Sequence, residues 1–272
     1  MPNRNETISV DPINPPAAYI GGKRVLSKTI VARINATPHT GYAEAFVGMG
    51  GVFFKRTHKP KTEVINDRSG EVANLFRILQ RHYPQFMETL KFQISSRREF
   101  QRLVACEPAT LTDLERAARF LYLQRLSFGG KVTGQTFGVD RHGGGRFNVT
   151  RLGPVLEDIH ERMAGVVIEQ LDWRAFLKRW DRPGMLFYLD PPYFGNEGDY
   201  GKDLFSRDDF TALNEALKAL KGRFILSLND RPEVREIFSG FQIETVDCTY
   251  SISGGVGKKV KEVVISGSVP SI

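Results

Sequence analysis

The chain has 272 residues, of which 41% are hydrophobic and 11% aromatic, so it can bury one large α/β core or a core with a smaller inserted domain. Its 38 Lys and Arg residues against 31 acidic residues give a net charge of +7, which favours a polyanionic partner. No apolar run approaches the roughly 20 residues of a membrane span, and the N-terminal arm lacks a signal core, so we expect a cytoplasmic protein without a membrane partner.

The first third of the chain predicts two strands and a helix. Residues 43–54 (AEAFVGMGGVFF) predict a buried strand, a glycine turn and the start of a helix. Residues 62–67 predict a second short strand that ends in an acid, and apolar residues at helical spacing predict a helix over 70–80. A strand, a turn and a helix in this order are typical of an α/β fold.

The next block differs in composition. Residues 83–126 predict several helices, the last of which begins where Thr112 and Glu115 have the spacing of a capping box. Residues 127–151 are rich in Gly, Arg, Thr and aromatic residues, which favours a loop and β-hairpin over a core helix. We therefore expect an inserted second domain over 83–155.

The remaining chain returns to alternating elements. Helices are predicted at 153–163, 172–180, 208–220 and 232–238, and strands at 185–189, 223–228, 241–247 and 262–267. Strands that alternate with helices indicate a mostly parallel sheet covered on both faces. We expect residues 1–82 and 156–272 to form this core domain, interrupted by the insertion.

A glycine turn after the first strand favours a nucleotide-like ligand. Gly48 and Gly50 allow the backbone to turn tightly and to approach a ligand closely. Asp67 follows at about 20 positions, where an acid can accept from ribose hydroxyls. Phe53 stands where the dinucleotide fingerprint needs its third glycine, and Glu44 suits a positively charged cofactor better than a pyrophosphate. The alternative is a glycine turn that binds no ligand.

The tetrapeptide that follows the strand at 185–189 combines several features of a base-binding turn. Asp190 ends a strand at the edge of the sheet where ligands bind. Pro191 and Pro192 remove two amide donors and stiffen the loop, and Tyr193 offers a flat face for stacking. A carboxylate, a free carbonyl and an aromatic ring suit an exocyclic base amine. A strand-terminating turn with a capping aspartate is the alternative.

Together these segments resemble the Dam-like D12 class of adenine-specific DNA methyltransferases, which use S-adenosylmethionine. The segments that carry the resemblance are AYIGGKRVL (18–26), EAFVGMGGVFF (44–54), DPPY (190–193), ILSLND (225–230) and SISGGVGKKVKEVVIS (251–266). The resemblance implies a Rossmann-like, mostly parallel, seven-stranded methyltransferase sheet with helices on both faces. It also implies that 83–155 is an inserted, mainly helical target-recognition domain with a β-hairpin.

The resemblance also implies roles for individual residues. The implied cofactor site consists of Tyr19, Lys23, Glu44, Phe46, Gly48, Gly50, Asp67, Asp172 and Asp190. Asp67 would accept from the ribose of the cofactor, and Asp172 would contact its adenine. The implied catalytic residues are Asp190, Pro191, Pro192 and Tyr193, of which Asp190 and Tyr193 would hold the flipped adenine. Ala45, where the family often has proline, costs loop stiffness but removes no contacting group.

Basic residues of the insertion and of the C-terminal turn are the expected DNA contacts. The candidates are Arg141, His142, Arg146, Asn148, Arg151, Lys258 and Lys259. Arginine reads guanine edges and asparagine reads adenine edges, but both also bind phosphates, so a solvated basic hairpin remains the alternative. We expect double-stranded DNA as the partner, with the two lysines on phosphates.

The expected reaction is direct displacement, in which the N6 amine of adenine takes a methyl group and S-adenosylhomocysteine leaves. We expect no metal, because the five histidines show no ligand spacing, and two reduced cysteines. Methylation of cytosine N4, methylation of RNA and an inactive nucleic-acid-binding relative are the alternatives. A monomer from a bacterium or phage is expected; neither the recognition sequence nor a cognate restriction endonuclease can be determined from the sequence.

Overall fold

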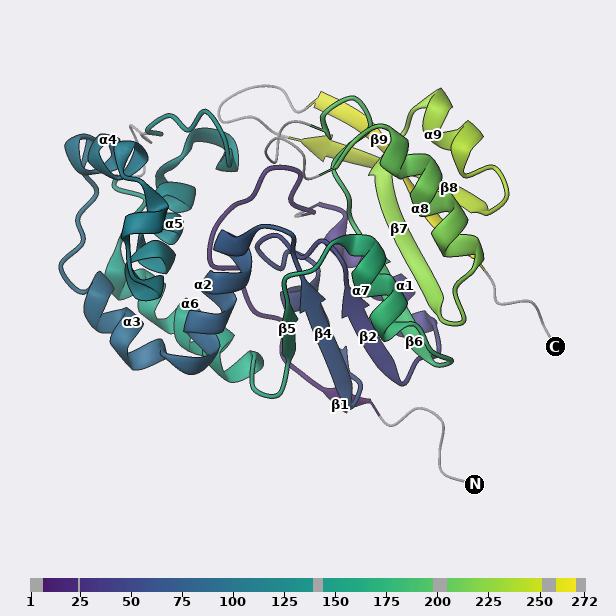
Figure 1. Cartoon of the computed structure of the whole chain (residues 1–272), viewed down its shortest axis with the longest axis horizontal. Helices are drawn as coiled ribbons and strands as arrows, with labels where there is room; N and C mark the ends of the chain where they lie inside the picture. The colour runs from purple at the N-terminus through teal and green to yellow at the C-terminus, as the bar shows by residue number, and fades with distance from the viewer. Residues whose placement is uncertain (1–6, 24, 139–143, 198–204, 251–257, 268–272) are drawn as a thin grey trace.

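The computed structural model of the chain describes residues 7–23, 25–138, 144–197, 205–250 and 258–267. Within them one sheet has seven strands in the order β5-β4-β2-β6-β7-β9-β8 (Figure 1). The strands are β1 (Ile8–Ser9), β2 (Gly41–Glu44), β3 (His58–Lys59), β4 (Thr62–Asn66), β5 (Val167–Glu169), β6 (Met185–Leu189), β7 (Arg223–Asn229), β8 (Gln242–Tyr250) and β9 (Lys258–Gly267). Strands β5, β4, β2, β6 and β7 run parallel to one another, and β9 runs antiparallel to β7 and β8. The predicted α/β fold is confirmed.

Helices cover both faces of the sheet. They are α1 (Ser27–Ala36), α2 (Gly70–Arg81), α3 (Tyr83–Leu90), α4 (Arg97–Ala105), α5 (Asp113–Leu126), α6 (Val149–Arg162), α7 (Trp173–Trp180), α8 (Asp208–Lys218) and α9 (Pro232–Ile237), with 3-10 turns η1 (Phe53–Lys55), η2 (Pro108–Thr110) and η3 (Phe128–Gly130). The face with Tyr42 and Leu186 packs against α1 and α2, while the face with Ala43 and Phe187 packs against α7, α8 and α9. Among the described residues, no helix is both long and apolar enough to span a membrane.

Strand β6 brings the Asp-Pro-Pro-Tyr turn (190–193) to the centre of the sheet. All five of its residues are buried, because β2 and β7 flank it and helices cover both of its faces. A continuous apolar run in place of an alternating one is what a doubly covered parallel strand requires. The strand predicted at 185–189 is confirmed, and its carboxyl end leads directly into Asp190.

The helices of the predicted insertion pack against the core. Phe86, Phe100 and Leu121 belong to the same apolar cluster as Tyr42 of the sheet. Helix α5 begins with the predicted capping box, since the side chains and backbone of Thr112 and Glu115 are reciprocally bonded. In the predicted hairpin region, an isolated bridge joins Ser127 to Phe137, and residues 139–143 lie outside the described residues.

Two local predictions were wrong. The helix expected after the glycine turn is only η1, because the next residue, Arg56, is extended and its buried guanidinium pairs with Glu63. The core strand β5 was missed, because it has three residues, all exposed or partly exposed, and so carries no apolar run. Strands β8 and β9 are also longer than predicted.

Candidate active site

A pocket lies where the strand order reverses. From β2 the chain proceeds to β4 and β5 on one side, while β6 lies on the other side, and such a switch point leaves a crevice at the carboxyl ends of the strands. The arrowheads of β4 and β7 point toward this edge, at the top of Figure 1. A cavity of about 530 Å³ opens there. Its lining comes mainly from the N-terminal segment, the glycine turn, residues 67–69 and the end of β6.

The glycine turn forms one wall of the cavity. Gly48 and Gly50 have φ values of 51° and 74°, in the left-handed region that glycine tolerates. The ring of Tyr19 lies against Gly48, where an added Cβ would stand 2.8 Å from the ring. Asp67 accepts from the amide nitrogens of Gly48 and Ser69, each at 2.9 Å, and so fixes the turn to the end of β4. Burial raises the pKa of Asp67 to about 6.

Glu44 lies at the base of the cavity, at the end of β2. Its side chain is buried, and the hydroxyl of Tyr42 donates to its Oε1 at 2.6 Å. Burial raises the pKa of Glu44 to about 8, so the protein holds an uncharged acid here at neutral pH. A cation placed beside Glu44 would lower that pKa and favour the carboxylate.

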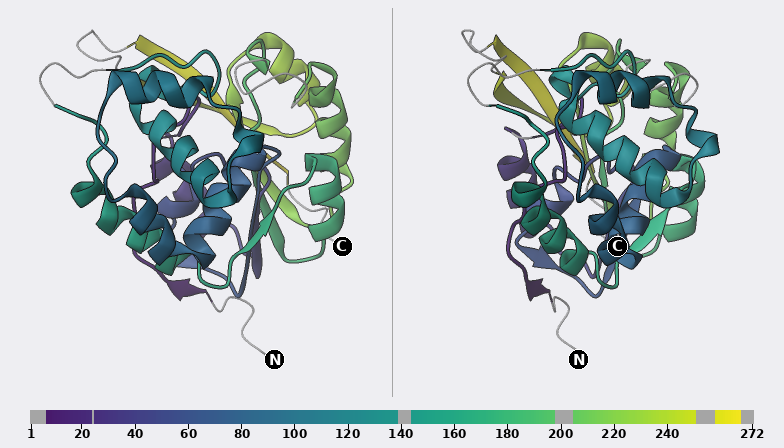
Figure 2. Two further views of the ribbon diagram at one scale, coloured as in Figure 1. Left: turned by 60° about the vertical axis from the view of Figure 1, so that its left-hand side comes forward. Right: turned by 90° about the vertical axis from the view of Figure 1, so that its left-hand side faces the viewer.

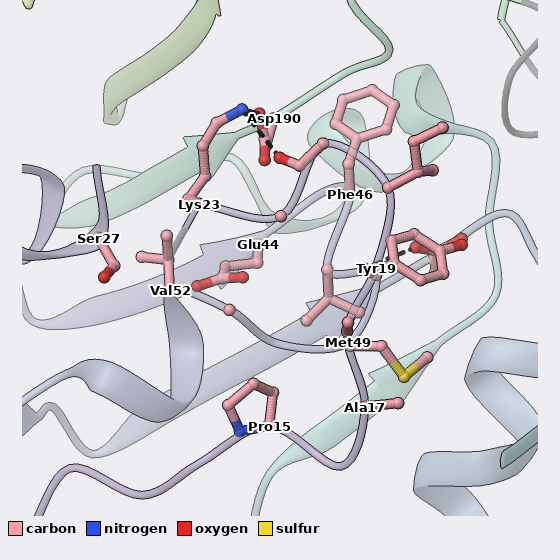
Figure 3. Close-up of a pocket in the computed structure, with 18 of the residues that line it drawn as sticks. Pro15, Ala17, Tyr19, Lys23, Ser27, Glu44, Phe46, Met49, Val52 and Asp190 are labelled. Atoms are coloured by element: carbon pink, nitrogen blue, oxygen red, sulfur yellow. Dashed lines mark hydrogen bonds and ion pairs between the residues drawn. The ribbon is translucent and has the colours of Figure 1, made fainter. Parts of the chain in front are cut away.

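The opposite wall is the turn after β6. Asp190 Oδ1 lies 2.8 Å from the amine nitrogen of Lys23 and accepts from the hydroxyl of Ser227 at 3.0 Å. Figure 3 shows the Lys23 amine directed at Asp190, with Glu44 and Phe46 in the same pocket. The Asp190 side chain is 19% exposed, whereas that of Lys23 is 1% exposed. Burial raises the pKa of Asp190 to about 6, although the ammonium of Lys23 opposes that shift.

Strands β7 and β9 hold the rest of this turn. The Asn229 side chain accepts from the Phe194 amide at 2.9 Å and donates to its carbonyl at 3.0 Å. The Tyr193 hydroxyl accepts from Lys23 at 2.8 Å and donates to Glu262 at 2.7 Å. Pro191 and Pro192 are buried. The turn is therefore fixed at several points by side chains from two neighbouring strands.

Comparison with known proteins gives the family. The family model described as D12 class N6 adenine-specific DNA methyltransferase matches residues 19–252. The chain belongs to this family.

Three relatives agree with this assignment. The type II methyltransferase M1.LlaDCHI of Lactococcus lactis subsp. cremoris is 26% identical over 87% of this chain and 88% of its own. The type II methyltransferase M.CviBI of Paramecium bursaria Chlorella virus NC1A is 21% identical over 80% and 85%. The DNA adenine methylase of Haemophilus influenzae is 24% identical over 80% of each chain. The protein is therefore an adenine-specific DNA methyltransferase.

In this methyltransferase, most of the predicted cofactor residues line one cavity. They are Tyr19, Lys23, Glu44, Phe46, Gly48, Asp67 and Asp190. Gly50 shapes the same turn but is not in the lining. Within the described ranges, no three His, Cys, Asp or Glu side chains are grouped closely enough to hold a metal ion.

Two predicted site residues cap helices. Asp172 does not line the cavity; it caps helix α7 by accepting from the Arg174 amide at 2.9 Å. Asn148 caps α6 by accepting from the Arg151 amide at 3.2 Å. Both side chains are short acceptors that stand one residue before a helix, which is the position where such residues satisfy free amides.

The remaining candidates for DNA contact lie at the surface or outside the described residues. Arg146 is partly exposed and Arg151 is exposed. Arg141 and His142 lie outside the described residues, as do the side chains of Lys258 and Lys259.

Three residues that support the site, Ser227, Asn229 and Glu262, were not predicted from the sequence. A detectable signal was present for Glu262, since it is an acid inside the apolar strand EVVIS. An acid in such a strand requires a buried partner.

Proposed function

We propose that this methyltransferase moves a methyl group from S-adenosylmethionine to the N6 amine of an adenine that has been flipped out of duplex DNA. The observation that carries the proposal is the position of Asp190, whose carboxylate reaches the cavity at the switch point of the sheet. A carboxylate at this point can accept a hydrogen bond from the target amine and orient it. Bound S-adenosylmethionine would supply an activated methyl group and leave as S-adenosylhomocysteine.

The residues present fit this cofactor. The glycine turn and Tyr19 form a close-fitting wall, and Asp67 is an acid at the end of β4 that can accept from a ribose hydroxyl. Glu44 suits the positive charges of the sulfonium and the amino group, since it becomes ionised when a cation approaches. Phe46 lies at the cavity beside Phe205, in an edge-on ring pair. We propose that these residues hold the cofactor with its methyl group toward Asp190.

Asp190 and the rigid proline turn would prepare the amine for attack. In adenine the N6 lone pair is drawn into the ring, so the amine is a weak nucleophile. Hydrogen bonds from its two N–H groups to Asp190 and to a proline carbonyl favour a pyramidal nitrogen. As the nitrogen gains the methyl group it becomes acidic, and its proton passes to Asp190. Tyr193 would stack on the flipped base in place of the bases that flank it in the duplex.

The rate of methyl transfer is expected to rise with pH through about 6. Asp190 must be ionised to accept the amine hydrogens, and burial places its pKa at about 6. Below that pH the carboxyl is protonated and the rate falls; above about pH 7 the rate reaches a plateau. Single-turnover rates at saturating cofactor test this expectation, and a rate that does not change between pH 5 and 8 would contradict it.

Cofactor binding is expected to release a proton from Glu44 at neutral pH. Its pKa of about 8 means that the carboxyl is mostly protonated in the free protein, and the adjacent cation lowers that pKa. Affinity should therefore rise with pH up to about 8. Calorimetry in two buffers with different ionisation enthalpies measures the release. Glu44→Gln should show none, and a wild-type protein that releases no proton would show that the cation does not lie beside Glu44.

Helix α4 of the insertion and the β8–β9 pair lie toward the edge of the sheet that carries the site. In Figures 1 and 2, α4 and the β8–β9 ribbon both lie at the top, where the strands end. We propose that residues 83–155 form the target-recognition region and that duplex DNA lies across this edge, in the cytoplasm. Arg146 and Arg151 are its candidate contacts from the insertion, and a monomer suffices because one site modifies one base.

A transfer assay separates this function from its alternatives. Tritium-labelled S-adenosylmethionine is incubated with the protein and with either unmethylated plasmid DNA or total RNA. Label in duplex DNA alone supports the proposal; label in RNA alone selects the RNA alternative, and no label on either selects an inactive relative. Two relatives are named type II methyltransferases, so we propose a modification role beside a restriction endonuclease.

A further inference from the structure

Glu262 is a fully buried acid in strand β9. Its relative exposure is 0%, and its cross-strand partners are Asn229 on β7 and Val246 on β8. The residue lies beyond the segment 19–252 that matches the family model and does not line the cavity. Burial of a carboxylate is costly unless charges and hydrogen bonds compensate, so its contacts indicate its role.

Those contacts join Glu262 to the turn that follows β6 and to Lys23. Glu262 Oε1 accepts from the Tyr193 hydroxyl at 2.7 Å, and Oε2 lies 3.6 Å from the Lys23 amine. The same amine donates to the Tyr193 hydroxyl at 2.8 Å and lies 2.8 Å from Asp190. Glu262 therefore contacts both the tyrosine of the turn and the counter-ion of its aspartate.

This arrangement anchors the Tyr193 side chain at its hydroxyl. The hydroxyl is bonded at the far end of the side chain, while the Lys23 amine lies 4.3 Å from the ring centroid. The ring itself is only partly buried. Without Glu262 the hydroxyl would keep the bond from Lys23 but lose this acceptor, so the side chain would be held less firmly and a base would have to order it on arrival. A ring that is already oriented removes that entropic cost.

We propose that Glu262 is a positioning residue that holds Tyr193 in the orientation for stacking the target base and shares the charge of Lys23 with Asp190. The inference rests on the proposed function, because it names the residue that prepares the base-binding turn. The role has two separate parts. The Tyr193 part depends on a hydrogen bond, whereas the Lys23 part depends on the negative charge.

Three variants separate these two parts in single-turnover assays at saturating cofactor. Glu262→Leu removes both bond and charge and should lower the transfer rate by ~10–100-fold, the loss expected for a hydrogen bond to a charged acceptor. Glu262→Gln keeps an acceptor for Tyr193 and should recover most of that loss at pH 8. Tyr193→Phe keeps the ring but removes the bonds of the hydroxyl to both Glu262 and Lys23, so it should also lower the rate by ~10-fold or more. The double variant should be no slower than the slower single variant.

Matched controls exclude a general effect on folding. Glu244→Gln removes an exposed acid from the neighbouring strand β8 and should leave the rate unchanged. Thermal unfolding of every variant reports stability separately. If Glu262→Gln and Glu262→Leu lose equal activity, or if the losses of Glu262→Leu and Tyr193→Phe add fully in the double variant, the positioning role is overturned.

The pH dependence of the transfer rate tests the part of the role that depends on the negative charge of Glu262. In the described part of the chain, the charged and titratable groups around Asp190 include Lys23, Glu262, Glu44, Tyr188 and Tyr193. Among them the carboxylate of Glu262 raises the pKa of Asp190. Glu262→Gln should therefore move the acid limb of the rate profile to lower pH. A merely structural role would leave that limb in place.

A signal from Tyr193 itself keeps this inference distinct from the proposed function. In protein with ¹³C-labelled tyrosine, the signal that disappears in Tyr193→Phe identifies the residue without DNA. Glu262→Leu should shift that signal, and an unchanged signal would overturn the contact. If the signal shifts but the wild-type protein transfers no methyl group to DNA, the contact stands and the proposed function, with the positioning role, fails.

Discussion

Replacement of Asp190 with alanine is expected to abolish measurable methyl transfer, a loss of ~10³-fold or more. The variant lacks the acceptor that orients the amine and later takes its proton. The glycine turn, Glu44 and Tyr19 are unchanged, so the dissociation constant of S-adenosylmethionine should rise less than ~tenfold. Single-turnover rates and calorimetry measure the two quantities separately.

A control for this experiment is Asp208→Ala, which removes an exposed acid at the start of α8 and should retain the wild-type rate. Asp190→Asn keeps the size of the side chain and should still lose most of the activity, because an amide cannot take up the proton. Equal activity of Asp190→Ala and the wild-type protein would refute the role given to this carboxylate.

Lys23→Met is expected to lower the transfer rate at pH 7 by ~100-fold. The Lys23 ammonium is the strongest of the groups that lower the pKa of Asp190. Without it the folded-state pKa rises, so a smaller fraction of Asp190 is ionised at neutral pH. The rate should then increase with pH through a higher midpoint than in the wild-type protein, with partial recovery at about pH 9.

The same substitution leaves Asp190 and Glu262 without their shared ammonium. Loss of one partner from such a buried cluster costs ~3 kcal/mol of the free energy of unfolding. The cost should be smaller at pH 5 than at pH 8, because Asp190, whose pKa burial raises to about 6, can then be protonated. Chemical unfolding at the two pH values measures it, with Lys28→Met, an exposed position on α1, as the control. A wild-type pH–rate profile for Lys23→Met would show that Lys23 does not set the charge of Asp190.

Local patterns in the sequence predicted the core elements well. The apolar run at 185–189 requires a doubly covered strand, and the spacing of Thr112 and Glu115 requires a helix start; the structure has both. The short strand β5 lacks such a pattern, because its pairing with β4 is decided by the fold and not by its own three residues. Tertiary contacts also override the local pattern at η1, where the burial of Arg56 ends the helix after three residues.

The site was predictable only in part. The turn at Asp190 and the glycine turn carry their chemistry in adjacent residues, which a sequence displays directly. The bond from Lys23 to Tyr193 joins residues 170 positions apart, and no local pattern contains it. Asp172 and Asn148 each cap the helix that follows, and their expected contacts with the cofactor and with DNA stay predictions.

The identity of the modified nucleoside tests the central claim most directly. DNA that has been incubated with the protein and labelled S-adenosylmethionine is digested to nucleosides and resolved by chromatography with mass detection. The Asp190 turn and the family predict that all label elutes with N6-methyl-2′-deoxyadenosine. Label in N4-methyl-2′-deoxycytidine, or no labelled nucleoside from varied duplexes, would contradict it.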